Sequence, residues 1–122
     1  MAQYDDVEIL EQKAANDLLV AEMIVDNNDE LLEQAGFHLQ QFVEKKIKAE
    51  LHRRRVDYPW THDLGALLKV FPTTHVSEDD KTFLYILSRF AVESRYNDYF
   101  KPPWDGRQML ERAKKFAEMT NN

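Results

Sequence analysis

The sequence has no cysteine, only 3 Gly and 4 Pro, and no apolar run close to the ~18 residues that a membrane span needs. The lack of cysteine excludes a disulfide framework, a thiolate zinc site and a thiol nucleophile. The scarcity of Gly and Pro argues against a loop-rich all-β fold. No Gly-rich phosphate loop and no G-x-S-x-G elbow occur either.

Signals for export and for metal binding are also missing. The N-terminus MAQYDDVEIL lacks the basic start and apolar stretch of a secretory signal, so we expect a cytoplasmic protein without membrane association. The four histidines, His38, His52, His62 and His75, form no close ligand pair. We therefore expect no metal site and no cofactor.

The charge is acidic overall and unevenly distributed. The net charge is −6, which argues against broad, non-specific binding of nucleic acid. Residues 1–34 hold ten acidic residues and one lysine, whereas residues 45–55 hold six basic residues and one acid. Only the basic segment is expected to attract phosphate.

Apolar residues recur at three- and four-residue steps along most of the chain, which predicts helices. Helices are expected over 7–25, from 32 to near Arg55, over 64–71, from the Ser77 cap to near Arg95, and from about Asp105 onward. Thr61 or Asp63 is expected to cap the short 64–71 helix. The 122 residues suit one domain, 1–122. The predicted fold is all-α: an up-and-down four-helix bundle with a short extra helix in a crossover.

A polar stripe accompanies the apolar face of the second predicted helix. On a helical wheel its members fall together on one flank: His38, Gln41, Lys45, Lys48 and His52. Imidazole, amide and ammonium groups suit a phosphate or a base edge. The structural alternative is an ordinary polar flank, with Lys45 in an internal ion pair, for example with Asp17. For His62 the structural reading is a cap of the third helix or a hydrogen bond to the second.

The first predicted helix has an unusually wide apolar face. Besides the stripe from Val7 to Val25 it carries Leu19, Val20, Met23 and Ile24. One small bundle cannot cover so much apolar surface, so we expect a homodimer that buries part of it.

Four segments resemble the HEPN family of small helical domains. They are AANDLLVAEMI (14–24), GFHLQQFVEKKIKAEL (36–51), THDLGALL (61–68) and SRYND (94–98). The positions that match the family pattern are Ala14, Asp17, Leu18, Ala21, Phe37, His38, Gln40, Gln41, Glu44, Lys45, Lys48, Ala49, His62, Leu64, Leu67, Arg95 and Tyr96. The resemblance covers most of the chain and implies a helical bundle that is often dimeric.

The family has two functional branches. One comprises metal-independent RNases and toxins with an R-x4-6-H motif in the later helices. The other comprises domains that bind nucleotides or pair with a small nucleotidyltransferase. After Arg95 the required histidine position falls on Phe100, Lys101 or Pro102. Arg55-x6-His62 has the spacing but lies between the second and third helices, so we read it as chance.

The resemblance and the stripe together predict a non-enzymatic nucleotide-binding module or a nucleotidyltransferase partner. Lys45 and Arg95 are expected to contact phosphate, His38 and Gln41 to form hydrogen bonds, and Tyr96 to stack on a base. Two alternatives remain. One is an RNase toxin of a toxin–antitoxin pair that uses Arg95 with His62 or His38, and the other is a helical adaptor without a ligand.

Overall fold

The computed structural model describes residues 3–28, 30–71, 76–91 and 102–120, with side chains from residue 6 onward. These residues form helices and no strands: α1 (Gln3–Asn27), α2 (Leu32–Arg53), α3 (Leu64–Val70), α4 (Glu78–Arg89) and α5 (Gly106–Thr120). The predicted all-α bundle with a short extra helix is therefore confirmed. In the same residues, no helix has the length and apolar character needed to cross a bilayer.

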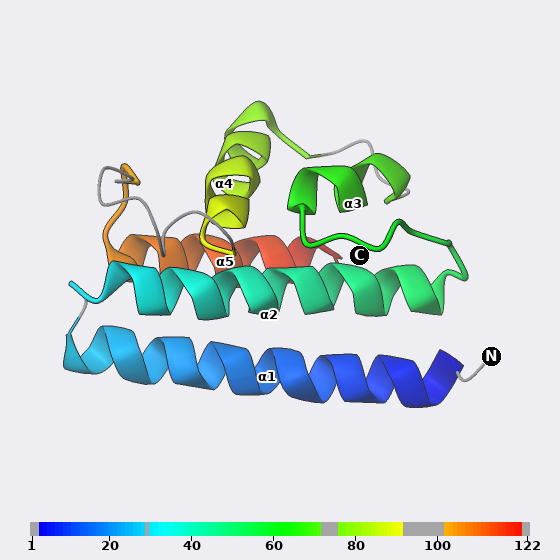
Figure 1. Ribbon diagram of the computed structural model, residues 1–122, viewed down its shortest axis with the longest axis horizontal. Helices are drawn as coiled ribbons and strands as arrows, with labels where there is room; N and C mark the ends of the chain where they lie inside the picture. The colour runs from blue at the N-terminus through cyan, green and yellow to red at the C-terminus, as the bar shows by residue number, and fades with distance from the viewer. Residues whose placement is uncertain (1–2, 29, 72–75, 92–101, 121–122) are drawn as a thin grey trace.

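Helix α2 is the centre of the arrangement. It lies antiparallel beside α1, with α5 along its other side, while α4 runs across this direction and α3 lies near the end of α2 (Figure 1). Helix α2 contacts each of the other four helices. Exposed ion pairs add links at the surface, such as Arg107 to Asp26 at 2.7 Å, which joins the start of α5 to the end of α1.

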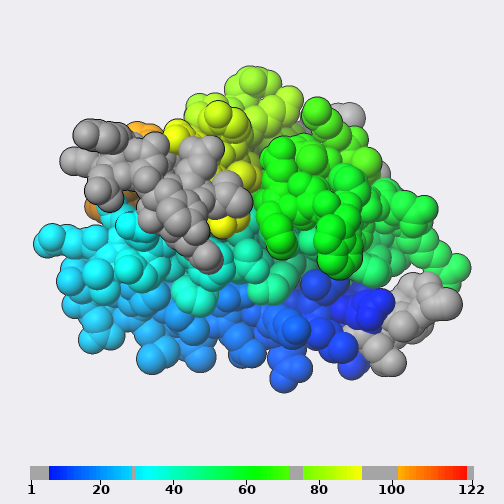
Figure 2. All heavy atoms as spheres, in the orientation of Figure 1, coloured from blue at the N-terminus to red at the C-terminus, as the bar shows by residue number. Residues whose placement is uncertain are grey.

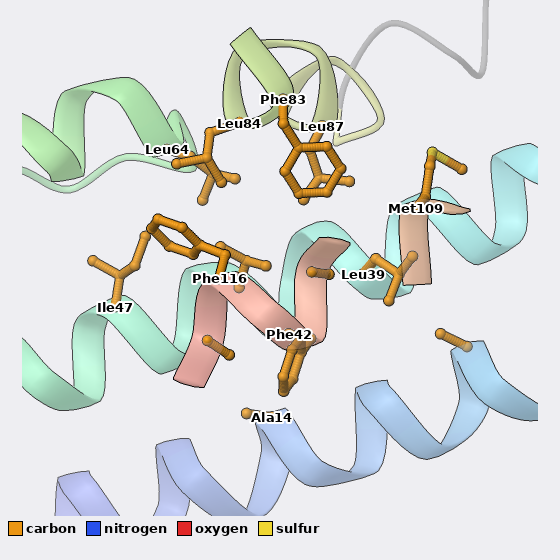
Figure 3. Packing of buried hydrophobic residues seen from close by; sticks show 14 of the residues in the cluster. Ala14, Leu39, Phe42, Ile47, Leu64, Phe83, Leu84, Leu87, Met109 and Phe116 are labelled. Atoms are coloured by element: carbon orange, nitrogen blue, oxygen red, sulfur yellow. The ribbon is translucent and has the colours of Figure 1, made fainter. Parts of the chain in front are cut away.

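The core forms where α2, α4 and α5 face one another. Figure 3 shows Phe83, Leu84 and Leu87 of α4 pointing toward α2 and α5. Leu39 and Ile47 of α2 and Met109 of α5 are fully buried in this cluster. On the other side of α2, Phe42 points toward Ala14 of α1. Apolar residues on opposite sides of one helix thus hold the layers together.

Local side-chain caps begin three helices, and the sequence predicts two of them, Asp63 and Ser77. Asp63 Oδ1 accepts from the Gly65 amide at 2.9 Å, and Ser77 Oγ accepts from the Asp80 amide at 3.0 Å. Asp105 and Gln108 each accept from the other's backbone amide, which is a capping-box arrangement before α5.

Helix α2 ends at Arg53, and Arg55 takes a left-handed φ of 58°. The Val56 amide then reaches back to the Leu51 carbonyl at 2.9 Å, which is the long bond of a Schellman motif without its usual glycine.

The expected end of α4 near Arg95 is wrong, because α4 ends at Arg89. The amides of Phe90 and Ala91 bond to carbonyls three residues back, and this tighter turn closes the helix. Arg95 itself lies outside the described residues.

Gly36 lets the end of α4 approach α2 closely. A Cβ at this position would lie 2.4 Å from a ring carbon of Phe90, which is almost completely buried. The ring fills the space that any other residue would need, and its burial leaves it little room to move.

Gly36→Ala is expected to destabilise the fold by about 1–3 kcal/mol through overpacking, although alanine favours helix. Thermal or urea unfolding of the purified variant measures the change. The double variant Gly36→Ala with Phe90→Leu should recover part of the loss, since it removes the clashing ring. Unchanged stability of the single variant would contradict the close approach.

Candidate functional site

The basic segment at the end of α2 is largely neutralised by acidic side chains. Of its six basic residues, five form ion pairs, as follows: Lys45 with Asp17, Lys46 with Glu11, Lys48 with Glu44, Arg53 with Glu11 and Glu50, and Arg54 with Glu50. Most of the positive charge of this segment, which the sequence predicts to attract phosphate, is therefore paired with carboxylates of the same chain.

Two of the five predicted ligand-binding residues bond to Asp17 on α1, and a third, Gln41, bonds to one of them. His38 Nδ1 lies 2.9 Å from Asp17 Oδ1, and Lys45 Nζ donates to Asp17 Oδ2 at 2.5 Å. Lys45 Nζ also lies 3.3 Å from the side-chain oxygen of Gln41. The other two predicted residues, Arg95 and Tyr96, lie outside the described part of the chain.

This grouping matches the internal ion pair that the structural alternative predicts. Asp17 and Lys45 are both mostly buried, so their charges are better satisfied by each other than by water. A ligand phosphate at Lys45 would have to replace the Asp17 carboxylate. The binding role of His38, Gln41 and Lys45 stays a prediction.

The hydrogen bonds continue from Gln41 to a buried amide. Gln41 Nε2 donates to Gln40 Oε1 at 2.7 Å, and Gln40 is 0% exposed. Gln40 Nε2 donates in turn to Glu44 Oε1 at 2.9 Å and to the His62 carbonyl at 3.0 Å. One connected network thus runs from α1, across α2, to the segment before α3.

Glu44 is the buried carboxylate at the far end of this network. It is 4% exposed, accepts from Lys48 Nζ at 2.9 Å, and lies 3.0 Å from His62 Nδ1. Burial acts to raise the pKa of Glu44, but hydrogen bonds from Lys48, Gln40 and His62 outweigh it and hold the pKa below its ordinary value. Glu44 is therefore ionised at neutral pH.

An ionised carboxylate can only accept hydrogen bonds, so His62 must carry a proton on Nδ1. The Glu44 carboxylate thereby fixes the plane of the imidazole ring and leaves Nε2 as the nitrogen that can meet a ligand. The sequence reading of His62 as a hydrogen-bond partner of the second helix is confirmed. Asp63 is confirmed as the cap of α3.

His62 lines a cavity of about 390 Å³ between the start of α3 and the second half of α4. We call it the His62 pocket. Its other polar and aromatic walls are Thr61, Asp63, Tyr85, Ser88 and Arg89. Ser88 Oγ accepts from the Leu64 amide at 2.9 Å, which ties this wall to α3. The volume lies within the range of small-molecule sites.

Sequence reasoning did not find this pocket, because its walls come from segments more than 20 residues apart. One face of α4 does carry Tyr85, Ser88 and Arg89, which lie three and four residues apart. This spacing is a sequence feature that could have indicated one wall of the pocket. The polar stripe of α2 does not line the pocket: Gln41 and Lys48 are linked to His62 only through Gln40 and Glu44.

Replacing Glu44 tests the buried carboxylate. Because the folded pKa lies below the unfolded value of about 4.3, Glu44 adds stability above that pH and loses it as the pH falls through the folded pKa. Glu44→Gln should lower the free energy of unfolding by about 1.5–3 kcal/mol at pH 7. The stability of this variant should also fall less steeply as the pH is lowered.

Urea unfolding between pH 3 and pH 7 measures both effects of Glu44→Gln. Glu111→Gln, an exposed acid on α5, is the matched control and should leave the profile unchanged. An acid dependence as steep in Glu44→Gln as in the unmodified protein would refute this account.

The described residues offer no metal site, and comparison with known proteins identifies the family of the chain. No group of three or more His, Asp or Glu side chains in the described ranges is placed to hold a metal ion. Searches of curated proteins and of solved structures returned no significant match. The family model described as the HEPN domain matches residues 7–122, nearly the whole chain. The chain belongs to the HEPN domain family.

Proposed function

We propose that this chain is a nucleotide-binding HEPN module whose ligand occupies the His62 pocket. One observation carries the proposal: a histidine oriented by a buried, ionised carboxylate lines a cavity that arginine, hydroxyl and aromatic side chains also line. A nucleotide presents matching chemistry, since it joins an anionic phosphate to a flat base. The absence of R-x4-6-H after Arg95 favours binding over cleavage.

The phosphate belongs at the wall formed by His62, Ser88 and Arg89. A guanidinium forms two parallel hydrogen bonds to phosphate oxygens, and imidazole Nε2 and the serine hydroxyl add directional contacts. Glu44 keeps the imidazole in place while the phosphate binds, because their hydrogen bond uses only Nδ1.

The nucleoside belongs against Tyr85 and Asp63. The Tyr85 ring is 67% exposed on the same wall, so it offers a face for stacking of a base. The Asp63 carboxylate can accept from a ribose hydroxyl or an amino group. It also repels a second phosphate at that end, which favours monophosphates over longer polyphosphates.

Tyr85→Ala should weaken binding of AMP or GMP about tenfold, the equivalent of about 1.4 kcal/mol, because stacking is lost. Calorimetric titration measures the affinity, which we expect between micromolar and millimolar. Trp60→Ala is the matched control, since Trp60 is 98% exposed and does not line the pocket. Adenosine should bind more weakly than AMP if the phosphate is recognised.

Other variants distinguish this site from the alternatives. Lys45→Ala should lower the melting temperature and leave nucleotide affinity unchanged. Loss of affinity in Lys45→Ala but not in Tyr85→Ala would place the ligand on α2 and overturn the proposal. RNA cleavage in EDTA that disappears in His62→Ala would favour the RNase alternative instead.

We also propose that the chain forms a homodimer through α1. Leu19, Val20 and Met23 lie on one face of this helix and are 55%, 37% and 56% exposed. Ile9 is 50% exposed farther along the same helix. Helix α1 forms the lower edge of the coloured part of the molecule in Figure 2, and no other described helix lies below it. A second copy would remove this surface from water.

Light scattering should report a particle of twice 14.5 kDa at micromolar concentration. Leu19→Glu with Met23→Glu should convert it to a monomer with unchanged helix content, since both side chains face solvent in one copy. Trp60→Glu, an equally polar change at another exposed apolar residue, should leave the dimer intact. A monomer before any substitution would end this proposal.

Pairing with a small nucleotidyltransferase stays a prediction, and co-purification with such a protein tests it.

A further inference from the structure

A second cavity lies on the other side of Tyr85. It also has a volume of about 390 Å³, and we call it the Lys69 pocket. Its walls come from α3, from α4 and from Val76 just before α4. The residues that matter for its chemistry are Leu68, Lys69, Val76, Lys81 and Tyr85. Tyr85 and Asp63 also line the His62 pocket, so these two residues separate the cavities.

The inner walls of the Lys69 pocket are apolar. Leu68 and Val76 pack against the hydrophobic core and are half-buried, so each presents apolar surface to the cavity. Tyr85 adds the face of an exposed ring, and Gly65 contributes backbone without a side chain. A ligand body that covers these walls removes apolar surface from water on both sides.

Two lysines give the same cavity positive charge. Lys69 is exposed on α3 and forms no hydrogen bond or ion pair within the described residues. Lys81 lies one turn before Tyr85 on α4, and within the described part of the chain it pairs with the almost fully exposed Glu78 at 3.3 Å. Such an exposed pair is weak, so the Lys81 ammonium can turn to a ligand at little cost.

Among the described residues that line the cavity, one acid opposes these two lysines. Asp63 lines the cavity at its boundary with the His62 pocket, and its Oδ1 accepts from the Gly65 amide as the cap of α3. Among the described lining residues, two ammonium groups face one carboxylate, which leaves an excess of positive charge beside an apolar wall; Glu78, the ion-pair partner of Lys81, is not among them. That combination attracts an anion with an apolar body more than it attracts a cation or a neutral molecule.

We propose that the Lys69 pocket binds a small apolar carboxylate, with its aliphatic or aromatic body on Leu68, Val76 and Tyr85 and its carboxylate between Lys69 and Lys81. The proposal goes beyond nucleotide binding, because it concerns a separate cavity and another class of ligand. The size of the cavity and its paired lysines favour a free small molecule over a segment of a partner protein.

Two fluorescent probes with the same body separate the charge from the apolar surface. They are 1-anilinonaphthalene-8-sulfonate, an apolar anion, and N-phenyl-1-naphthylamine, which lacks the sulfonate. Lys69→Ala with Lys81→Ala should weaken binding of the anionic probe at least tenfold and change binding of the neutral probe less than twofold. Leu68→Asn should weaken both. Lys115→Ala, an exposed lysine on α5, is the control and should change neither.

Competition identifies the ligand class. Decanoate and indole-3-acetate should displace the anionic probe from the unmodified protein, whereas decanol should displace it at least tenfold less well. Anionic-probe binding that is insensitive to the two lysines, as expected for a probe on the exposed face of α1, would overturn the proposal. Displacement by decanol as effective as by decanoate would overturn it too. Titration with AMP in the same lysine variant should be unchanged, so failure here is distinguishable from failure of the His62 pocket.

Discussion

A buried carboxylate needs compensation, and Glu44 obtains it from Gln40 and Lys48 on its own helix and from His62 ahead of α3. The last of these bonds joins parts of the chain 18 residues apart. The return of the chain from the end of α2 to the start of α3 is therefore fixed by electrostatics as well as by apolar packing. The position of α3, and with it one wall of each pocket, depends on this contact.

The network explains what the family signature encodes. The polar residues that carry the resemblance in the described part of the chain are Asp17, His38, Gln40, Gln41, Glu44, Lys45, Lys48 and His62, and all of them belong to it. Most of these side chains bond to one another. A signature of polar residues thus describes hydrogen bonds within this bundle, and only His62 among them, whose side chain is 67% exposed, lines a described cavity.

Local features of the fold were predictable from sequence, whereas the cavities were not. Helical periodicity placed the helices, and the short polar side chains of Asp63 and Ser77 cap α3 and α4 because capping depends on neighbours within three residues. The end of α4 depends on Phe90 docking against Gly36, which is a contact across 54 positions that no local pattern shows. The stripe on α2 was a real feature, but a wheel cannot tell whether Lys45 faces solvent or Asp17.

The ion pairs of this protein lie at two depths, and salt will act on them differently. The pair of Arg107 and Asp26 is half-exposed or more on both sides, so water and dissolved salt weaken it. The pair of Glu44 and Lys48 is mostly buried on both sides and loses less to screening. Rising ionic strength should therefore weaken this link between α5 and α1 before it weakens the pair of Glu44 and Lys48. The molecule thus keeps its pockets organised in solutions where its outer electrostatic links are weak.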